Sequence, residues 1–152
     1  MPKASVTRQI EGEKNKLINF VLDIEKYPEF IPWCEAVRIN SRLSSPSSCD
    51  ETVNADMVVS FKLYREKFTS KVTLNQSEGT IVVEYVNGPF KFLRNKWVFL
   101  PVDTRCDIDF TVEFEFRSVI KQRLIGMFFS EAMKRVVNSF EKRAEQLYRT
   151  TG

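Results

Sequence analysis

Acidic side chains are the first candidates for chemistry in this sequence, because two facing carboxylates are able to act as general acid and general base. Asp107, Asp109, Glu113 and Glu115 lie close together, but they alternate with apolar residues throughout residues 106–116. In a strand this alternation places all four on one face, opposite the apolar side chains. We therefore interpret them as a solvated face and not as a catalytic acid cluster.

Glu66 is the acidic residue for which two roles remain. It lies in the segment REKF, between Arg65 and Lys67. Its carboxylate is able either to accept a hydrogen bond from the head group of a ligand or to pair with one of these cations. Surface pairing is the more common arrangement, although it contributes little stability.

Other residue types limit the chemistry further. The chain has no histidine, which excludes Ser-His-Asp and Cys-His catalysis and histidine-bound zinc or haem. Cys34, Cys49 and Cys106 are widely spaced, which predicts reduced structural thiols and neither a disulfide framework nor a zinc site. The five glycines are too scattered for a Walker loop or a dinucleotide fingerprint. We expect no catalytic residue, no metal and no cofactor.

Length and charge limit the class of protein. With 152 residues and 43% hydrophobic content, we expect a single domain over residues 1–152. The first nine residues lack the pattern of a secretory signal, and no run of 18 apolar residues occurs, so we expect a soluble, cytoplasmic protein. The net charge of +3 is too small for a dedicated nucleic-acid binder, and we expect no DNA partner.

The elements that must position any site begin with short segments. Pro28 and Pro32 disfavour a helix at the residues that precede them. Apolar residues alternate before the first glycine and then take helical spacing. The predicted elements are a strand over 4–10, a helix over 13–22, a broken helix or pair of turns over 23–33, a strand near 34–43 and a polar loop over 41–51.

The middle of the chain has β character. Apolar residues occupy the odd positions from Val53 to Leu63, opposite mostly polar ones. The segments NQSEG, residues 75–79, and Gly88-Pro89 are typical of turns. The predicted strands cover residues 53–63, 67–75, 80–87, the region around KWVFLP (96–101) and 106–116.

A helical period marks the C-terminal part. Ser118 is a predicted N-cap of a helix that runs to Tyr148. At ~1.5 Å per residue, this helix is on the order of 45 Å long and able to cross a sheet. Its apolar stripe is predicted to contain Ile120, Leu124, Met127 and Phe128 in the first half and Met133, Val136, Val137, Phe140, Ala144 and Leu147 in the second.

Together these elements predict an α+β fold. An antiparallel sheet with one apolar face needs a cover, and the last helix is long enough to supply it. We expect a curved antiparallel sheet of about six to seven strands around a long C-terminal helix, with one or two short helices after the first strand. Periodicity leaves open whether the space between sheet and helix is filled or hollow.

Five segments also resemble a known family. They are DIEKYPEFIPWC (23–34), LYREKFTSKV (63–72), NGPFKFLRNKWVF (87–99), VEFEFRS (112–118) and FEKRAEQLY (140–148). In type and order they are similar to the coenzyme-Q-binding branch of the START-like, polyketide-cyclase-related proteins, which includes the bacterial ribosome-association toxin. The resemblance covers nearly the whole chain. It departs at Ser60, where relatives often carry glycine, and in the serine-rich stretch 44–48.

The resemblance implies a helix-grip fold whose cavity holds a polyprenyl quinone such as ubiquinone. The implied function is a carrier or chaperone that supports respiratory electron transport and catalyses no reaction, with residues 27–33 as a lid. Ser70 and Cys106 are interpreted as small core residues. For each residue named next, the alternative of a ring or chain that simply fills the core stays open. The expected ligand-binding residues are Tyr27, Phe30, Trp33, Phe61, Phe90, Leu93, Trp97, Phe110, Phe114, Met127, Phe128 and Met133.

Two further functions stay open. One is toxin-like binding to the large ribosomal subunit, which would block subunit joining, and the less favoured one is a cyclase- or dehydrase-like reaction. Clustered cations would suit either ribosomal RNA or anionic lipid. The expected partners are therefore a hydrophobic ligand, the inner membrane through a peripheral contact, and the ribosome as the alternative. The sequence does not specify the tail length of the ligand, the oligomeric state or the delivery target.

Overall fold

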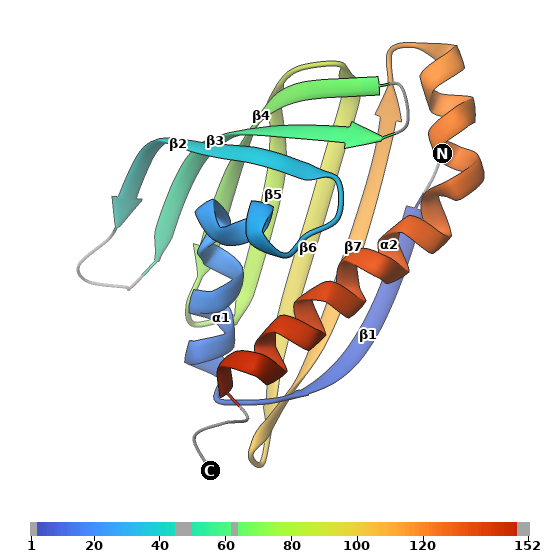
Figure 1. Ribbon diagram of the computed structural model, residues 1–152. Coiled ribbons are helices and arrows are strands. Elements are labelled where there is room, and N and C mark those ends of the chain that lie inside the picture. Colours follow the sequence, from blue (N-terminus) through green and yellow to red (C-terminus); the bar gives the residue numbers. More distant parts are fainter. Residues whose placement is uncertain (1–2, 45–49, 62–63, 149–152) are drawn as a thin grey trace.

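The computed structural model describes residues 3–44, 50–61 and 64–148, and it confirms the α+β architecture (Figure 1). One further element, η1, is a short 3-10 helix. The bounds are β1 Lys3–Glu11, α1 Lys14–Leu22, η1 Ile24–Glu29, β2 Cys34–Ser44, β3 Glu51–Phe61, β4 Tyr64–Asn75, β5 Thr80–Asn87, β6 Phe90–Val102, β7 Arg105–Phe116 and α2 Val119–Tyr148.

All seven strands belong to one antiparallel sheet with the order β1-β7-β6-β5-β4-β3-β2. The strands from β2 to β7 form a meander, whereas β1 pairs with β7, from Lys3 opposite Glu113 to Glu11 opposite Arg105. β1 and β2 are therefore the two edges of the sheet. As Figure 1 shows, the sheet is curved and α2 crosses its inner face diagonally, which is the predicted helix-grip arrangement.

Strand β7 carries the clearest inner face of the sheet. Every second residue is buried, and the acidic residues between them are half-buried or exposed on the outer face, as the alternation predicts. The prediction that these acidic residues share one outward strand face, opposite the apolar side chains, is therefore confirmed. The buried set is Cys106, Ile108, Phe110, Val112, Phe114 and Phe116.

The predicted polar loop over residues 41–51 is partly wrong. β2 continues to Ser44, and β3 begins at Glu51, because these residues pair with each other across the two strands. Residues 45–49, which include Cys49, lie outside the described residues, and so does Leu63. Of the remaining cysteines, Cys34 and Cys106 are free and buried, in agreement with the prediction of reduced thiols.

The turn before β6 depends on Gly88. Its φ of +146° lies in a region that favours glycine, and a Cβ atom there would lie 2.7 Å from the Cβ of Phe68. The chain therefore passes directly against β4 at this point. The predicted Gly88-Pro89 turn is confirmed, and it brings Phe90 onto the inner face of the sheet, where it is buried.

The segment between the two edge strands packs against the inner side of the sheet. Leu17, Ile18 and Val21 of α1 are buried, because they recur at helical spacing on one face. Pro28 lies inside η1, a tighter and shorter helix, so the predicted broken helix over residues 23–33 is confirmed.

Helix α2 begins at the predicted cap, since the hydroxyl oxygen of Ser118 accepts a hydrogen bond from the backbone N–H of Lys121 at 3.3 Å. The second half of the predicted stripe is largely correct: Val137, Phe140 and Ala144 are buried. The first half is wrong in part. Ile120 is 73% exposed and Met127 is 72% exposed, and Phe129 is the buried residue of that half. No helix in the described part of the chain is long and apolar enough to cross a membrane.

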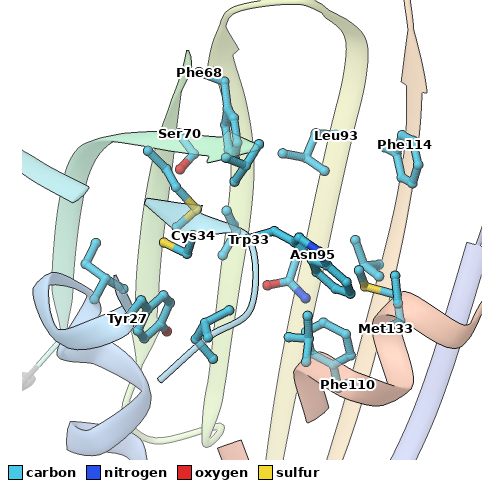
Figure 2. A pocket seen from close by; sticks show the side chains of 18 of the residues that line it. Tyr27, Trp33, Cys34, Phe68, Ser70, Leu93, Asn95, Phe110, Phe114 and Met133 are labelled. Atoms are coloured by element: carbon cyan, nitrogen blue, oxygen red, sulfur yellow. The ribbon is translucent and has the colours of Figure 1, made fainter. Parts of the chain in front are cut away.

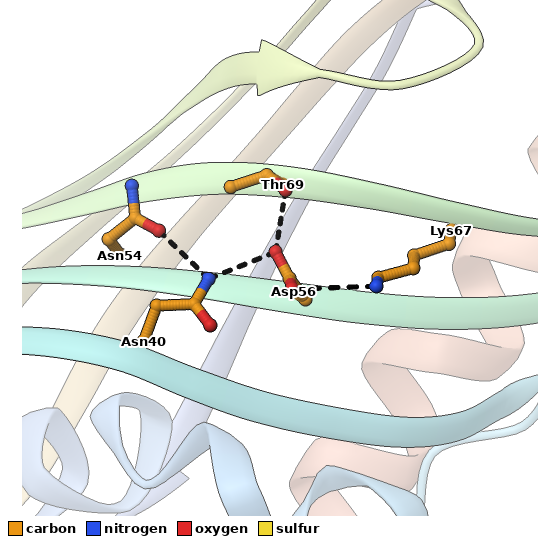
Figure 3. Close-up of polar contacts among 5 residues, drawn as sticks. All are labelled: Asn40, Asn54, Asp56, Lys67 and Thr69. Atoms are coloured by element: carbon orange, nitrogen blue, oxygen red, sulfur yellow. Dashed lines mark hydrogen bonds and ion pairs between the residues drawn. The ribbon is translucent and has the colours of Figure 1, made fainter.

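A polar network stabilises the outer face of β2, β3 and β4 (Figure 3). Asp56 accepts hydrogen bonds from Thr69 at 2.5 Å and from Asn40 at 3.0 Å, and its carboxylate lies 3.7 Å from Lys67 Nζ. Asn40 also donates to Asn54 at 3.1 Å. The hydrogen bond from Thr69, followed by the one from Asn40, holds the pKa of Asp56 below its usual range. The network fixes the register of three strands on the side away from α2.

Candidate functional site

A cavity of about 320 Å³ lies between the inner face of the sheet and α2 (Figure 2). The space is therefore hollow, which answers the question that periodicity left open. Strands β3 to β7 supply its floor, α2 covers it, and η1 with the following turn closes one side. Almost all of its surface is apolar, and its volume lies within the range of roughly 300–1,000 Å³ typical of small-molecule pockets.

Most of the predicted ligand-binding residues meet in this cavity. They come from elements far apart in sequence, namely η1 and its following turn, β6, β7 and α2. Figure 2 shows several of them pointing into the same space. The predicted residues that line the cavity are Tyr27, Trp33, Phe90, Leu93, Trp97, Phe110, Phe114, Phe128 and Met133.

Two predicted residues lie elsewhere, and a third is not described. Phe30 stacks on Phe20, with ring centroids 5.6 Å apart, and lies under the guanidinium of Arg143, so it does not line the cavity. Met127 points to solvent, because it lies one position before Phe128, which faces the cavity. The side chain of Phe61 lies outside the described residues.

Several lining residues were missed by sequence reasoning. Val112 and Phe116 carry the same alternation as Phe110 and Phe114, so that signal was sufficient to find them. Asn95 was missed because a polar residue was not expected on an apolar wall. Ser70 was interpreted as a core residue, and the structure places it in the cavity wall (Figure 2). Cys106 is fully buried and does not line the cavity, in agreement with its predicted core role.

The turn after η1 closes one side of the cavity in a strained conformation. Trp33 has a φ of 68°, which is unfavourable for a side chain of this size. Its backbone carbonyl accepts a hydrogen bond from the N–H of Ser60 at 2.9 Å, and this bond holds the turn against the end of β3. Strain of this kind persists where the surrounding structure imposes it, so the position of the Trp33 ring is determined by the fold.

Both ends of α2 are fastened by ion pairs. Near its start, Lys121 pairs with Glu66 of β4 and lies 5.5 Å from the centroid of the Tyr64 ring. Near its end, Arg143 lies 3.2 Å from a carboxylate oxygen of Glu29 in η1. The predicted pairing of Glu66 with Arg65 or Lys67 is therefore wrong.

The neighbours of Glu66 have other partners. Arg65 pairs with Glu35 at 2.6 Å, and Lys67 pairs with Asp56. Both cations point away from the inner face, because they alternate with the residues that face α2. The carboxylate of Glu66 reaches Lys121 across the space between β4 and α2, a contact between segments that are distant in sequence.

The polar groups of the cavity wall offer little reactivity. Burial raises the pKa of the Cys34 thiol to about 11, so it stays protonated at neutral pH. The hydroxyl of Tyr27 donates to the backbone carbonyl of Val21, and burial raises its pKa far above the usual value. Neither group is a nucleophile or base near pH 7. Within the described chain, no three metal-binding side chains lie together.

Asn95 is the amide of the cavity wall, and its side chain is engaged. Its Nδ2 donates to the backbone carbonyl of Thr111 at 2.9 Å, and its Oδ1 accepts from Trp97 Nε1 at 3.0 Å. These two bonds fix the indole of Trp97 against the wall. Asn95 therefore positions an aromatic ring of the cavity wall.

A family model described as polyketide cyclase / dehydrase and lipid transport matches residues 15–141. The chain is 33% identical over 144 residues to the ribosome association toxin RatA of Rickettsia prowazekii, an alignment that covers 93% of this chain and 94% of that protein. It is also 30% identical over 156 residues to the mitochondrial coenzyme Q-binding protein COQ10 homolog B of Xenopus laevis, covering 93% and 61% of the two chains.

A solved structure supports the fold independently. The START superfamily protein of Mycobacterium smegmatis superposes with a TM-score of 0.78, covering 95% of this chain and 98% of that one, at 16% sequence identity. At this identity the likeness concerns the fold alone. The predicted START-like fold and family are confirmed together by the structure, the family match and these relatives.

Proposed function

This chain belongs to the polyketide cyclase, dehydrase and lipid transport family, and on that premise we propose that it binds and carries a polyprenyl quinone such as ubiquinone without catalysing a reaction. The observation that carries the proposal is the apolar cavity of about 320 Å³ between the sheet and α2. The quinone-binding relative supports the choice of ligand class.

An apolar tail suits this cavity better than a small polar metabolite. Each buried methylene contributes roughly 0.8 kcal/mol, whereas association costs on the order of 4–15 kcal/mol. About ten buried carbons are therefore needed to reach useful affinity, and a prenyl tail supplies them. A small metabolite would need several well-placed polar contacts, and the wall consists mainly of aromatic and aliphatic side chains.

We propose that the protein catalyses no reaction because of the protonation state of the polar groups in the cavity wall. The thiol of Cys34 and the hydroxyl of Tyr27 are both protonated at neutral pH, for the reason given above. A general acid–base mechanism needs a group whose pKa lies near the working pH. The curated relatives described above are named as a toxin and as a quinone-binding protein, which agrees with a binding role.

We propose that the start of α2 docks on an anionic membrane. Val119, Ile120 and Met127 expose apolar side chains there, and Met127 is adjacent to the cavity residue Phe128. Residues 116–130 contain cations but no acidic residue. Cations are unfavourable at a helix N-terminus by about 0.3–1 kcal/mol, because they oppose the helix dipole. An anionic lipid surface accounts for both the exposed apolar chains and the positive charge.

Ligand binding is testable with the two tryptophans of the chain, Trp33 and Trp97, which both line the cavity. A bound quinone is expected to quench their fluorescence. Ala132→Phe fills the cavity from α2 without adding a third tryptophan to the fluorescence signal. Ala36→Phe makes the same substitution on the exposed surface of β2 and is the matched control. We expect saturable quenching in the wild type and in the control, and at least tenfold weaker binding in Ala132→Phe.

The same preparation gives a direct chemical test. Lipids that co-purify with the wild type are extracted and identified by mass spectrometry, beside Ala132→Phe. A near-stoichiometric prenyl quinone that is reduced in the variant supports the carrier proposal. Absence of quinone, together with absence of quenching after quinone is offered in vesicles, overturns it.

Membrane docking is tested by co-sedimentation with vesicles of phosphatidylcholine alone or with added phosphatidylglycerol. We expect binding to the anionic vesicles and its loss in the Ile120→Asp, Met127→Asp double variant. Leu147→Asp introduces the same charge at an exposed site near the other end of α2 and should bind as the wild type does. Equal binding by all three proteins would refute this docking surface.

A second function is favoured by a different surface. Lys3, Arg94 and Lys96 gather on the outer face of the sheet, where Lys3 and Arg94 lie on either side of Glu113. Such a cluster suits an RNA backbone, and the relative named ribosome association toxin points to the same partner class. The alternative proposal is therefore that the chain binds the large ribosomal subunit through this face and blocks subunit joining.

The two functions are separated by crossed variants. Arg94→Glu, Lys96→Glu should abolish co-sedimentation with large ribosomal subunits and leave vesicle binding intact, whereas Ile120→Asp, Met127→Asp should do the reverse. Ribosome binding through this face should also weaken steeply as salt rises. Ribosome binding that is unaffected by the Arg94 and Lys96 changes would refute the alternative.

A further inference from the structure

Ser70 is a polar residue in a largely apolar cavity wall. It lies in the middle of β4, is 5% exposed, and is a buried polar residue on the inner face of the strand. Along the strand it is flanked on the same face by Phe68 and Val72, which also line the cavity. Figure 2 shows its hydroxyl directed into the cavity from the sheet.

The hydroxyl of Ser70 has no hydrogen-bond partner in the part of the chain that the structure describes. Other hydroxyl and amide groups of the wall are engaged: Tyr27 donates to Val21, Asn95 contacts Thr111 and Trp97, and Ser60 bonds Glu35. Among the described residues, the oxygen of Ser70 is not one of the fully enclosed atoms without a partner, so it keeps access to the cavity and is open to a ligand there. Ser70 is therefore a donor that the protein leaves unused.

The local backbone gives a ligand access to this hydroxyl. Ser70 pairs across the sheet with Ala55 of β3, and both side chains line the cavity. Two small side chains at paired positions leave room above the sheet that larger ones would fill. On the other side, the register between β4 and β5 shifts between Thr69 and Ser70. Bulges of this kind re-aim side chains and are common next to binding sites.

We infer that Ser70 is the anchor of a head-group subsite, where its hydroxyl donates a hydrogen bond to a carbonyl oxygen of the ligand ring. The inference rests on the proposed function, and it adds the orientation of the ligand. The ring lies over Ala55 and Ser70, and the apolar tail extends along Phe90, Phe114 and Phe129. These three residues form an aromatic chain, with ring centroids 5.9 Å apart for Phe90 and Phe114 and 4.7 Å apart for Phe114 and Phe129.

The chemistry of the subsite defines the ligand class. A serine hydroxyl donates to a carbonyl, ether or hydroxyl oxygen, and a ring that carries such oxygens satisfies it. An unsubstituted hydrocarbon leaves it unpaired. Wild-type protein should therefore prefer a prenylated quinone over a prenylated benzene of the same tail length, by on the order of three- to tenfold for one neutral hydrogen bond.

Ser70→Ala tests this preference without removing any bond within the protein. We expect the variant to be as stable as the wild type, because the hydroxyl has no partner to lose. Binding is measured by calorimetry with a ubiquinone that carries a two-unit prenyl tail and with a benzene that carries the same tail. The quinone should bind Ser70→Ala three- to tenfold more weakly, and the prenylated benzene should bind it no more weakly than the wild type, because it makes no bond to the hydroxyl.

Two matched variants test whether the preference for quinone depends on a hydroxyl at position 70. Ser60→Ala removes the other serine hydroxyl of the cavity wall, which already bonds Glu35, and should keep the preference for quinone. Ser70→Thr keeps a hydroxyl at the subsite and should retain most of the preference. A loss of preference in Ser70→Ala alone supports the head-group subsite.

The outcomes separate this inference from the proposed function. If the wild type binds neither compound, the carrier function itself fails. If the wild type binds both and Ser70→Ala shows an unchanged preference, the subsite is refuted and the carrier function stands. If Ser70→Ala weakens both compounds equally, Ser70 shapes the cavity and makes no bond to the head group, which also refutes the subsite.

Discussion

Replacing Phe140 with leucine should destabilise the protein by about 2–3 kcal/mol, because this ring joins α2 to η1 and to the sheet. Phe140 is 5% exposed, and it makes edge-to-face contacts with four rings. Each such pair contributes roughly 0.5–1.5 kcal/mol beyond area burial. Leucine keeps much of the apolar volume but loses the free energy of these ring–ring contacts. The four ring partners and centroid distances are Trp97 at 4.9 Å, Tyr27 at 5.2 Å, Phe30 at 5.5 Å and Phe20 at 5.9 Å.

The assay is urea unfolding followed by circular dichroism, with protein from which bound lipid has been extracted, because a ligand would stabilise the folded state. For a domain of this length, 1 kcal/mol corresponds to about 2–4 °C in Tm, so a decrease of roughly 4–12 °C is expected in a thermal scan. Leu147→Ala changes an exposed residue of the same helix and should alter stability by less than about 0.5 kcal/mol. A loss below about 0.5 kcal/mol for Phe140→Leu would refute the reasoning.

Three other measurements address single interactions. A double-mutant cycle on Lys121→Met and Glu66→Gln should give a coupling energy of about 1–2 kcal/mol, because the ion pair is largely buried. A coupling energy near zero would show that this ion pair does not hold α2 against β4. The pKa of Asp56 is lower in the folded than in the unfolded protein, so its carboxylate stabilises the fold above the unfolded-state pKa, and this stabilisation is lost as pH falls through the folded-state pKa. The difference in unfolding free energy between wild type and Asp56→Asn should therefore shrink below about pH 4. A difference that stays constant with pH would contradict this. In a Cys49→Ser background, Cys34 should react with iodoacetamide at pH 8 at least about 100-fold more slowly than free cysteine, since its pKa is raised to about 11; reaction at the free rate would contradict the burial of the thiol.

The faces of the strands were predictable from sequence to a large extent. The alternation from Cys106 to Phe116 specifies which side chains point inward, because the side-chain period of a strand is two residues. It therefore also identified the cavity residues Phe110 and Phe114. The hollow itself was not predictable, since a filled core and a cavity require the same apolar pattern.

The first half of α2 was less predictable, because its apolar residues lie around more than one face. Ile120, Met127 and Phe129 all have apolar side chains, and only contact with the sheet decides which of them is buried. The pairing of Glu66 with Lys121 was out of reach for a similar reason. It joins residues distant in sequence, and nothing local distinguishes Lys121 from the nearer Arg65 and Lys67.

The pairing of β1 with β7 has a consequence for synthesis of the chain. The first strand finds its partner only after residues 105–113 have been made, so the two ends of the chain must meet before the sheet is complete. Contacts of such long sequence separation slow folding, and the aromatic inner face stays uncovered until α2, the last element, has been synthesised. The segment that closes the cavity thus also ends the period in which the nascent chain is prone to aggregate, and truncation within α2 should yield insoluble protein.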